Sequence, residues 1–165
     1  MKRLHGCCAA CWHNRWMTEG NLRQGSCFCG DVQYEIELPT LFCGHCHCSM
    51  CRRPHGAGFV TWTAVPPERF RIVEGNDLLT TFESSEHGRR QFCKTCGTQL
   101  FCWHEKSNGS APDFIDITLA SISDPIDRQP EMHFYFDSGA DWITVNDELP
   151  KLGGATGTEP LDKAE

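Results

Sequence analysis

The chain carries the stretch Cys27-Phe28-Cys29-Gly30, and a second stretch, Cys93-Lys94-Thr95-Cys96-Gly97, follows much later in the sequence. Thiols one or two residues apart converge on one metal ion when the backbone makes a tight turn, and a following glycine suits such a turn. Together the two pairs supply four thiolates, which form a closed, structural zinc site. Disulfides or four buried thiols are the alternative, but two such turns are hard to explain by core packing. We therefore predict a metal that clamps an early turn to a later hairpin.

A third cluster is the run Cys46-His47-Cys48-Ser49-Met50-Cys51. All three of its thiols can reach one ion from a single loop, and a three-ligand zinc site leaves a position for water or substrate. In the alternative, Cys48 and Cys51 pair with Cys93 and Cys96 as a zinc ribbon. The intervening stretch is longer than the ~15–20 residues usual for that pattern, and the first cysteine pair would be left without partners.

Basic side chains follow this cluster directly. Arg52 and Arg53 could meet carboxylates, because a guanidinium forms a fork that matches a carboxylate group. His55 could position a substrate. The alternatives are a solvated basic loop and a structural or surface histidine. Arg89-Arg90 is another candidate for a local basic patch.

Other cysteines and histidines lie near the clusters. Cys43 and Cys102 fit neither site and are predicted to be small buried residues, although Cys43 is close enough to Cys46 to be a spare ligand or a disulfide partner. Either His45 or His47 could provide a fourth ligand to the three-cysteine site.

Alternating and β-branched segments predict a mainly β fold with one short helix, over 48–55, limited by Pro54. The predicted fold is all-β in the main: a compact, zinc-containing single domain of short antiparallel strands over residues 23–152. Residues 1–22 are expected to be a flexible or artefactual extension that holds a loose cysteine group, with Met17 as a possible natural start. Residues 153–165, rich in glycine, threonine and proline, are expected to form a flexible tail. The strands are predicted over 32–37, 58–65, 70–73, 79–82, 90–92, 99–103, 114–119 and 133–136.

Composition narrows the possible partners and the compartment. The formal net charge is −7, which disfavours nucleic acid and anionic membranes as partners. No apolar run is long enough to span a membrane, and the N-terminal residues lack a secretory signal. These features predict a cytoplasmic protein, and in a reducing compartment clustered cysteines bind metal or carry out chemistry more often than they form disulfides.

The order of the cysteine motifs resembles the glutathione-dependent formaldehyde-activating enzyme family, also called the centromere protein V/formaldehyde-activating domain. The resemblance rests on three stretches, with weaker matches as far as Asp141-Trp142. These stretches are 25–32, 46–57 and 90–98. It covers roughly residues 23–150. Thr98 stands where the family usually has serine.

The resemblance implies a β-tent fold with two zinc sites. Cys27, Cys29, Cys93 and Cys96 then match the structural ligands. It further implies that Cys46, Cys48 and Cys51 hold the catalytic zinc, and that glutathione adds to formaldehyde to give S-hydroxymethylglutathione, a carbon–sulfur lyase reaction. Arg52, Arg53 and His55 would then contact the substrate. A zinc-stabilised module that binds glutathione or a protein without turnover is the second hypothesis.

Overall fold

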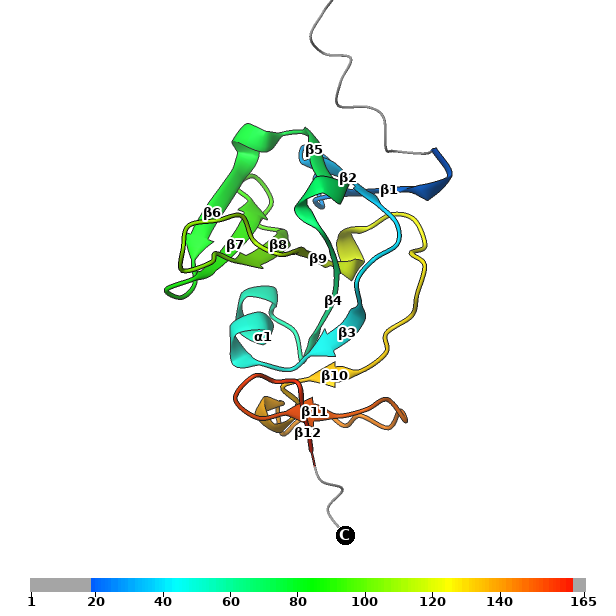
Figure 1. Cartoon of the computed structure of the whole chain (residues 1–165), viewed down its shortest axis with the longest axis vertical. Helices are drawn as coiled ribbons and strands as arrows, with labels where there is room; N and C mark the ends of the chain where they lie inside the picture. The colour runs from blue at the N-terminus through cyan, green and yellow to red at the C-terminus, as the bar shows by residue number, and fades with distance from the viewer. Residues whose placement is uncertain (1–18, 162–165) are drawn as a thin grey trace, which may run out of the picture.

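The computed structural model of the protein describes residues 19–161, which fold mainly as short antiparallel strands (Figure 1). This confirms the predicted fold class. One α-helix, α1 (Ser49–His55), accompanies three sheets. Because α1, with seven residues, is the longest helix in this part of the chain, no helix there could span a bilayer.

The largest sheet has seven strands in the order β10-β3-β4-β9-β8-β7-β6. All its pairings are antiparallel except that of β10 with β3. The strands are β3 (Cys43–Cys46), β4 (Val60–Val65), β6 (Leu79–Glu83), β7 (Gly88–Cys93), β8 (Gln99–His104), β9 (Ile115–Thr118) and β10 (His133–Phe134).

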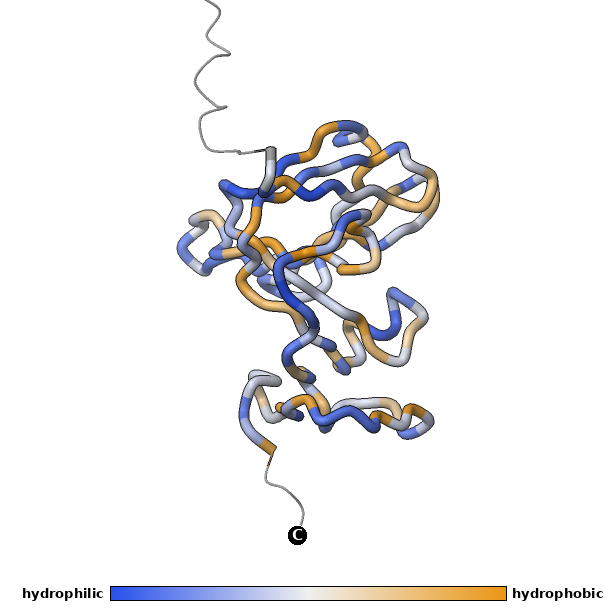
Figure 2. The backbone as a smooth tube through the Cα atoms, turned by 90° about the vertical axis from the view of Figure 1, so that its right-hand side faces the viewer, coloured by the Kyte–Doolittle hydropathy of each residue, from blue (hydrophilic) through white to orange (hydrophobic). Residues whose placement is uncertain are grey.

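Two smaller sheets lie at opposite ends of the molecule (Figure 1). The three-stranded sheet has the order β1-β2-β5, and the other is a two-stranded hairpin. Figure 2 shows this hairpin in a layer below the main body. The strands are β1 (Leu22–Ser26), β2 (Gln33–Glu37), β5 (Phe70–Glu74), β11 (Leu152–Gly153) and β12 (Glu159–Pro160).

The main hydrophobic core lies between the three-stranded sheet and the seven-stranded sheet. Alternation in β2 turns Tyr34 and Ile36 inward, where both are almost fully buried. The ring of Tyr34 meets Phe101 of β8 edge to face, with 4.9 Å between ring centroids, and Phe70 of β5 meets Phe101 at 4.8 Å. Cys27 and Cys93 belong to this same core, so the four-cysteine cluster closes one side of it.

A second, smaller apolar cluster surrounds the three-cysteine loop. Val60 and Trp62 of β4 pack there with Cys46, Cys51 and Cys102. The loop therefore has its own packing environment, separate from the main core.

The structure differs from the sequence prediction near the C-terminus. Only His133 and Phe134 of the segment 133–136 are in a strand, because Tyr135 takes a left-handed conformation and a 3-10 turn follows. A flexible tail was predicted from residue 153, whereas β11 and β12 form a hairpin, and the Tyr135 backbone N–H donates to the Gly157 carbonyl oxygen at 3.1 Å. Nearly all of the predicted N-terminal extension, including its cysteine group, lies outside the described residues, and Leu22 belongs to β1.

Candidate metal centres and substrate cavity

The structure brings Cys27, Cys29, Cys93 and Cys96 together, with all four sulfur atoms within 4.8 Å of one another. The Cys27 and Cys29 sulfurs are 3.4 Å apart, and those of Cys29 and Cys93 are 3.8 Å apart. Zinc–sulfur bonds of ~2.3 Å in a tetrahedron place neighbouring sulfurs ~3.8 Å apart. The thiols are free, so the geometry suits a shared metal ion such as zinc.

Both turns that carry these cysteines use a glycine in the left-handed region. Gly30 has φ of 83° and Gly97 has φ of 76°, conformations that other residues seldom adopt. The Gly97 N–H donates to the Cys93 carbonyl oxygen at 2.8 Å, which closes the second turn. Local backbone chemistry therefore orients each cysteine pair.

Thr98 joins the two turns. Its hydroxyl accepts a hydrogen bond from the Phe28 backbone N–H at 3.0 Å, which leaves the hydroxyl hydrogen for Cys96 Sγ at 3.1 Å. This hydrogen bond lowers the pKa of the Cys96 thiol to about 5. A thiolate is the form that binds metal, so Thr98 prepares Cys96 as a ligand.

The second set comprises Cys46 at the end of β3, Cys48 just before α1 and Cys51 within α1. Their sulfur atoms also lie within 4.8 Å of one another, and those of Cys46 and Cys48 are 3.5 Å apart. The Cys46 thiol donates to Cys48 Sγ, which raises the pKa of Cys46 and lowers that of Cys48. Cys46 and Cys51 are buried, while Cys48 is partly exposed and marks the open side. The donor set suits zinc or another thiophilic metal.

Arg90 of β7 lies behind the three-cysteine set. Its Nη2 donates to Cys51 Sγ at 3.6 Å, and its Nε is buried without a hydrogen-bond partner in the described structure. Across the sheet Arg90 pairs with Cys102, and Cys102 pairs with Asp116. Burial raises the pKa of Asp116 to about 7. Because its guanidinium contacts Cys51 Sγ, Arg90 places a positive charge next to the three cysteines.

The arginines of the loop have different environments. Arg52 donates from Nε to the His47 carbonyl oxygen at 2.8 Å and from Nη2 to that of Ser138 at 3.1 Å. These bonds tie α1 to the chain beyond β10. Arg53 is exposed, and its side chain has no hydrogen bond to the described part of the chain. The Arg89-Arg90 pair makes no basic patch, because Arg89 pairs with Glu105 at 2.7 Å while Arg90 turns inward.

His55 ends α1 and borders a cavity. Its Nδ1 donates to the Cys51 carbonyl oxygen at 2.8 Å, because a carbonyl can only accept. Nε2 therefore carries the lone pair in the neutral ring, and it is buried without a partner in the part of the chain described. Burial lowers the pKa of His55.

The other histidines of the cluster have partners of their own. His45 Nδ1 lies 2.9 Å from the Thr61 hydroxyl. His133 Nε2 donates to Asp147 at 2.9 Å, so His133 Nδ1 accepts from His47 Nε2 at 2.8 Å. Neither His45 nor His47 joins the metal-ligating groups among residues 19–161. Cys43 and Cys102 are buried outside both groups, and Cys43 pairs with Thr63 in the sheet.

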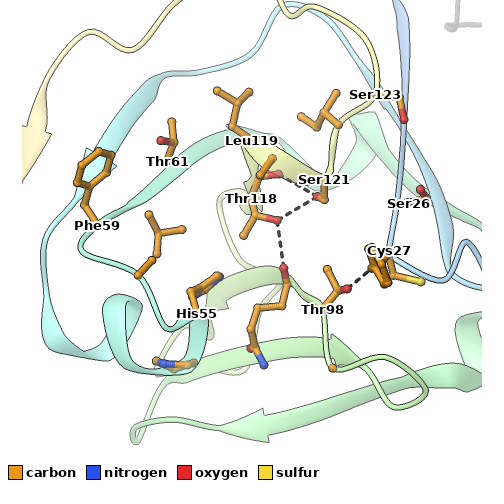
Figure 3. A pocket seen from close by; sticks show the side chains of 18 residues that line it. Ser26, Cys27, His55, Phe59, Thr61, Thr98, Thr118, Leu119, Ser121 and Ser123 are labelled. Atoms are coloured by element: carbon orange, nitrogen blue, oxygen red, sulfur yellow. Dashed lines mark hydrogen bonds between the residues drawn. The ribbon is translucent and has the colours of Figure 1, made fainter.

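A cavity of about 930 Å³ is lined by Cys27 of the four-cysteine set and by Pro54 and His55 at the end of α1, but by none of the three cysteines of the loop. Figure 3 shows Cys27 and Thr98 on one side and His55 and Phe59 on the other, with Ser121 between them. No acidic or basic side chain lines it apart from the histidine, and six of its lining side chains carry a hydroxyl group. These hydroxyls belong to Ser26, Thr61, Thr98, Thr118, Ser121 and Ser123.

The sequence interpretation missed Arg90 as a neighbour of the site. It named Arg90 as a candidate for a local basic patch and as the start of the stretch 90–98, but gave it no role at the site. The signal was available in strand periodicity: β7 places Arg90 on the same side as Gly88, and both are buried. To place the Arg90 side chain beside the three-cysteine loop, one must also know that Arg90 pairs with Cys102, which depends on the sheet register.

Residues 22–138 match the sequence model of the family described as glutathione-dependent formaldehyde-activating enzyme. The chain belongs to this family. All seven cysteines of the two centres lie within the matched segment, so the resemblance noted in the sequence is confirmed.

Individual relatives agree with the family match. A Halomonas elongata protein that bears the family's name is 24% identical over 131 residues, which cover 75% of this chain and 81% of the relative. A Schizosaccharomyces pombe protein described as an uncharacterised lyase is 33% identical over 98 residues, covering 58% of this chain and 66% of the relative. A crystal structure of a Rhodobacter sphaeroides protein matches with a TM-score of 0.51 at 25% identity, covering 63% of this chain and 91% of that chain.

Proposed function

We propose that this protein is a zinc-dependent enzyme of the carbon–sulfur lyase type that joins the thiol of glutathione to formaldehyde, giving S-hydroxymethylglutathione. The observation that carries the proposal is the division of seven cysteines into a closed group of four and an open group of three. The four-cysteine group would hold a structural zinc and the other a catalytic one. The names of the family and of the Halomonas relative support glutathione and formaldehyde as the substrates, and the name of the Schizosaccharomyces relative supports a lyase.

The three-cysteine loop would hold the catalytic zinc through Cys46, Cys48 and Cys51. Zinc bound there would favour the thiolate form of a bound thiol and polarise a carbonyl oxygen. Cys48, the exposed member, marks the side from which a substrate approaches. Arg90 offsets the negative charge of the thiolates through its hydrogen bond to Cys51.

The large cavity would hold the substrates beside this loop. In the reaction the sulfur–carbon bond forms, the carbonyl π bond breaks, and the thiol proton ends on the new hydroxyl group. His55 lines the cavity, and its unpartnered Nε2 would accept a hydrogen bond from that hydroxyl. The hydroxyl groups of Thr98 and Ser121 can meet the peptide groups of glutathione.

Exchange spectroscopy on a pre-equilibrated mixture of glutathione and formaldehyde tests the activity, because the reaction also proceeds uncatalysed. Wild-type protein is expected to speed the exchange between free thiol and adduct above the background rate. Cys48→Ser should lose this acceleration, and Cys43→Ser, which changes a buried cysteine outside both groups, should keep it. An exchange rate equal to the background at stoichiometric protein, with glutathione bound, would contradict turnover and favour the binding-module alternative.

A chelator assay tests the open site separately. Zinc held by three ligands on one loop should leave faster than zinc held by four, and a soft thiolate should compete for the vacant position. We expect the assay to detect one labile zinc in the wild type, which glutathione perturbs. We expect no labile zinc in Cys48→Ser. If the protein holds two zinc ions with equal affinity, and glutathione changes neither affinity, the open site is contradicted.

A further inference from the structure

A second cavity, of about 310 Å³, lies between α1 and β6. Figure 1 shows α1 below the ends of β6 and β7. Its walls are Ser49, Met50, Arg53, Pro54, Phe82, Ser84 and Arg90. Only Pro54 also lines the large cavity. The volume is at the lower end of the range for small-molecule sites.

Two guanidinium groups line this cavity and no carboxylate does, although the chain carries a formal net charge of −7. Asp116, which pairs with Cys102 beside Arg90, and Glu83, which lies between the lining residues Phe82 and Ser84, do not line the cavity. Arg53 has no ion pair within residues 19–161. The cavity is therefore a local positive site in an acidic protein.

Arg90 has unused hydrogen-bonding capacity at this place. The residue is only 7% exposed, and its Nε is buried with no partner in the described structure. One edge of its guanidinium contacts Cys51 Sγ at 3.6 Å. A buried guanidinium without an ion pair among residues 19–161 is costly, and a negative charge in the cavity would reduce that cost.

We propose that this cavity binds a small carboxylate through Arg53 and Arg90, and that the bound carboxylate weakens metal binding by the three-cysteine loop. The apolar rim selects a carboxylate that has an aliphatic body. Met50 is 45% exposed and Phe82 is 59% exposed, and both line the cavity. Inorganic phosphate could use the arginines but has no group for that rim.

The coupling arises because the carboxylate and the metal-loaded cysteines both interact with the Arg90 guanidinium. The coupling depends on the proposed three-cysteine zinc site. The carboxylate site does not depend on it. Metal binding requires all three cysteines as thiolates, and with one divalent cation the loaded cluster has a net charge of −1. Arg90 stabilises this negative cluster. A carboxylate on the same guanidinium offsets that stabilisation, so carboxylate and metal each lower the affinity for the other.

The carboxylate could be a free metabolite or part of the thiol substrate itself. Arg52, which was expected to meet a substrate carboxylate, is committed to two backbone carbonyls, and the large cavity offers no cationic anchor besides its histidine. Competition separates the two sources. If the substrate's own carboxylate occupies the site, propionate will weaken the binding of glutathione more than that of cysteamine, which has no carboxylate. If the site takes a free carboxylate, propionate will affect the two thiols equally.

The first test follows the carboxyl-carbon NMR signal of ¹³C-labelled propionate added to zinc-loaded, full-length protein at constant ionic strength. We expect saturable binding that weakens about tenfold in Arg53→Gln. The matched control, Arg69→Gln, removes an arginine that bonds the Pro39 carbonyl oxygen and should behave as wild type. No saturable binding, equal binding in Arg53→Gln, or phosphate binding as tight as propionate would overturn the carboxylate site.

The second test measures the affinity of Co²⁺ for the labile site from its thiolate-to-cobalt absorption. Propionate should lower that affinity severalfold in wild type and Arg69→Gln, and much less in Arg53→Gln. An affinity that propionate leaves unchanged would overturn the coupling. Neither test uses turnover, so failure of the proposed lyase activity would leave both results interpretable.

Discussion

At the scale of single residues, hydrogen bonds to sulfur prepare the cysteines as ligands. The Thr98 hydroxyl donates to Cys96 Sγ, and the Arg90 guanidinium donates to Cys51 Sγ. The Val32 backbone N–H donates to Cys27 Sγ at 3.3 Å. The Thr98 hydroxyl lowers the pKa of Cys96 and so favours the thiolate form that metals require. The two centres therefore depend on residues that do not themselves ligate.

Thr98→Val should destabilise the four-cysteine turn. The substitution keeps the shape of the side chain but removes the hydroxyl that links Phe28 to Cys96. We expect the free energy of unfolding to fall by about 1–2 kcal/mol, measured by urea denaturation of the zinc-loaded protein, and the pKa of Cys96 to rise. Thr98→Ser restores the hydroxyl and should recover most of the loss. Equal stability of Thr98→Val and wild type would contradict this role.

Cys93→Ser should cost far more, because it removes a fully buried ligand from the closed site. Loss of a structural metal removes folding free energy directly, so we expect a fall in melting temperature of about 10 °C or more, or insoluble protein. Cys43→Ser is the matched control, since Cys43 is equally buried but belongs to neither group. If Cys93→Ser has the same melting temperature as the wild type, the four-cysteine set does not hold a structural metal.

At the scale of elements, α1 is short and depends on its anchors. It has seven residues, contains Pro54 and has no side-chain cap at its N-terminus. A helix of this length is not stable alone. Arg52 and the packing of Cys51 therefore hold it, and with it the geometry of the three-cysteine loop.

Arg52→Gln should loosen that loop without touching the other centre. It removes the two guanidinium hydrogen bonds to the His47 and Ser138 carbonyl oxygens. We expect the labile zinc to bind about tenfold more weakly, while the tight zinc is unchanged, as measured by competition with a chelator. If Arg52→Gln instead weakens glutathione with both zinc affinities intact, Arg52 is a substrate contact as its position in the sequence suggested.

The segment before the first described strand can be tested as a unit. Residues 1–16 carry three basic residues and no acidic one, and they show no hydrophobic periodicity. A chain that begins at Met17 is expected to fold and to bind the same metals, checked by melting temperature and zinc content. Loss of a zinc equivalent in the shorter chain would mean that Cys7, Cys8 and Cys11 form a site of their own.

At the scale of the whole molecule, the two centres have different relations to the fold. The four-cysteine set is part of the main core, whereas the three-cysteine set packs in a smaller apolar cluster. We expect a chelator to remove zinc in two phases. The first phase should leave the far-ultraviolet circular dichroism unchanged, and only the second should unfold the protein. A single phase that coincides with unfolding would contradict two independent centres.

Much of the fold could be predicted because strand periodicity is local. The segments around Tyr34, Trp62 and Phe101 alternate or are β-branched and aromatic, and each forms a strand close to its predicted limits. The strand predicted over 133–136 is shortened to two residues at β10, and the prediction did not extend to β3. β3 is a short run of cysteine, glycine and histidine without strand propensity, and its pairing with β10 stabilises it.

The sequence by itself determined the two cysteine sets, because ligand spacing within a turn is a local property of the chain. Only the tertiary structure decided what surrounds them. Arg90 meets Cys51 because the register of β7 and β8 turns it inward, and His133 meets His47 because β10 lies beside β3. Register and sheet order arise from contacts between residues far apart in the chain, and no local pattern encodes them. Arg52, for which a carboxylate contact was predicted, donates to the His47 and Ser138 carbonyl oxygens, and the second of these contacts joins residues far apart in the chain.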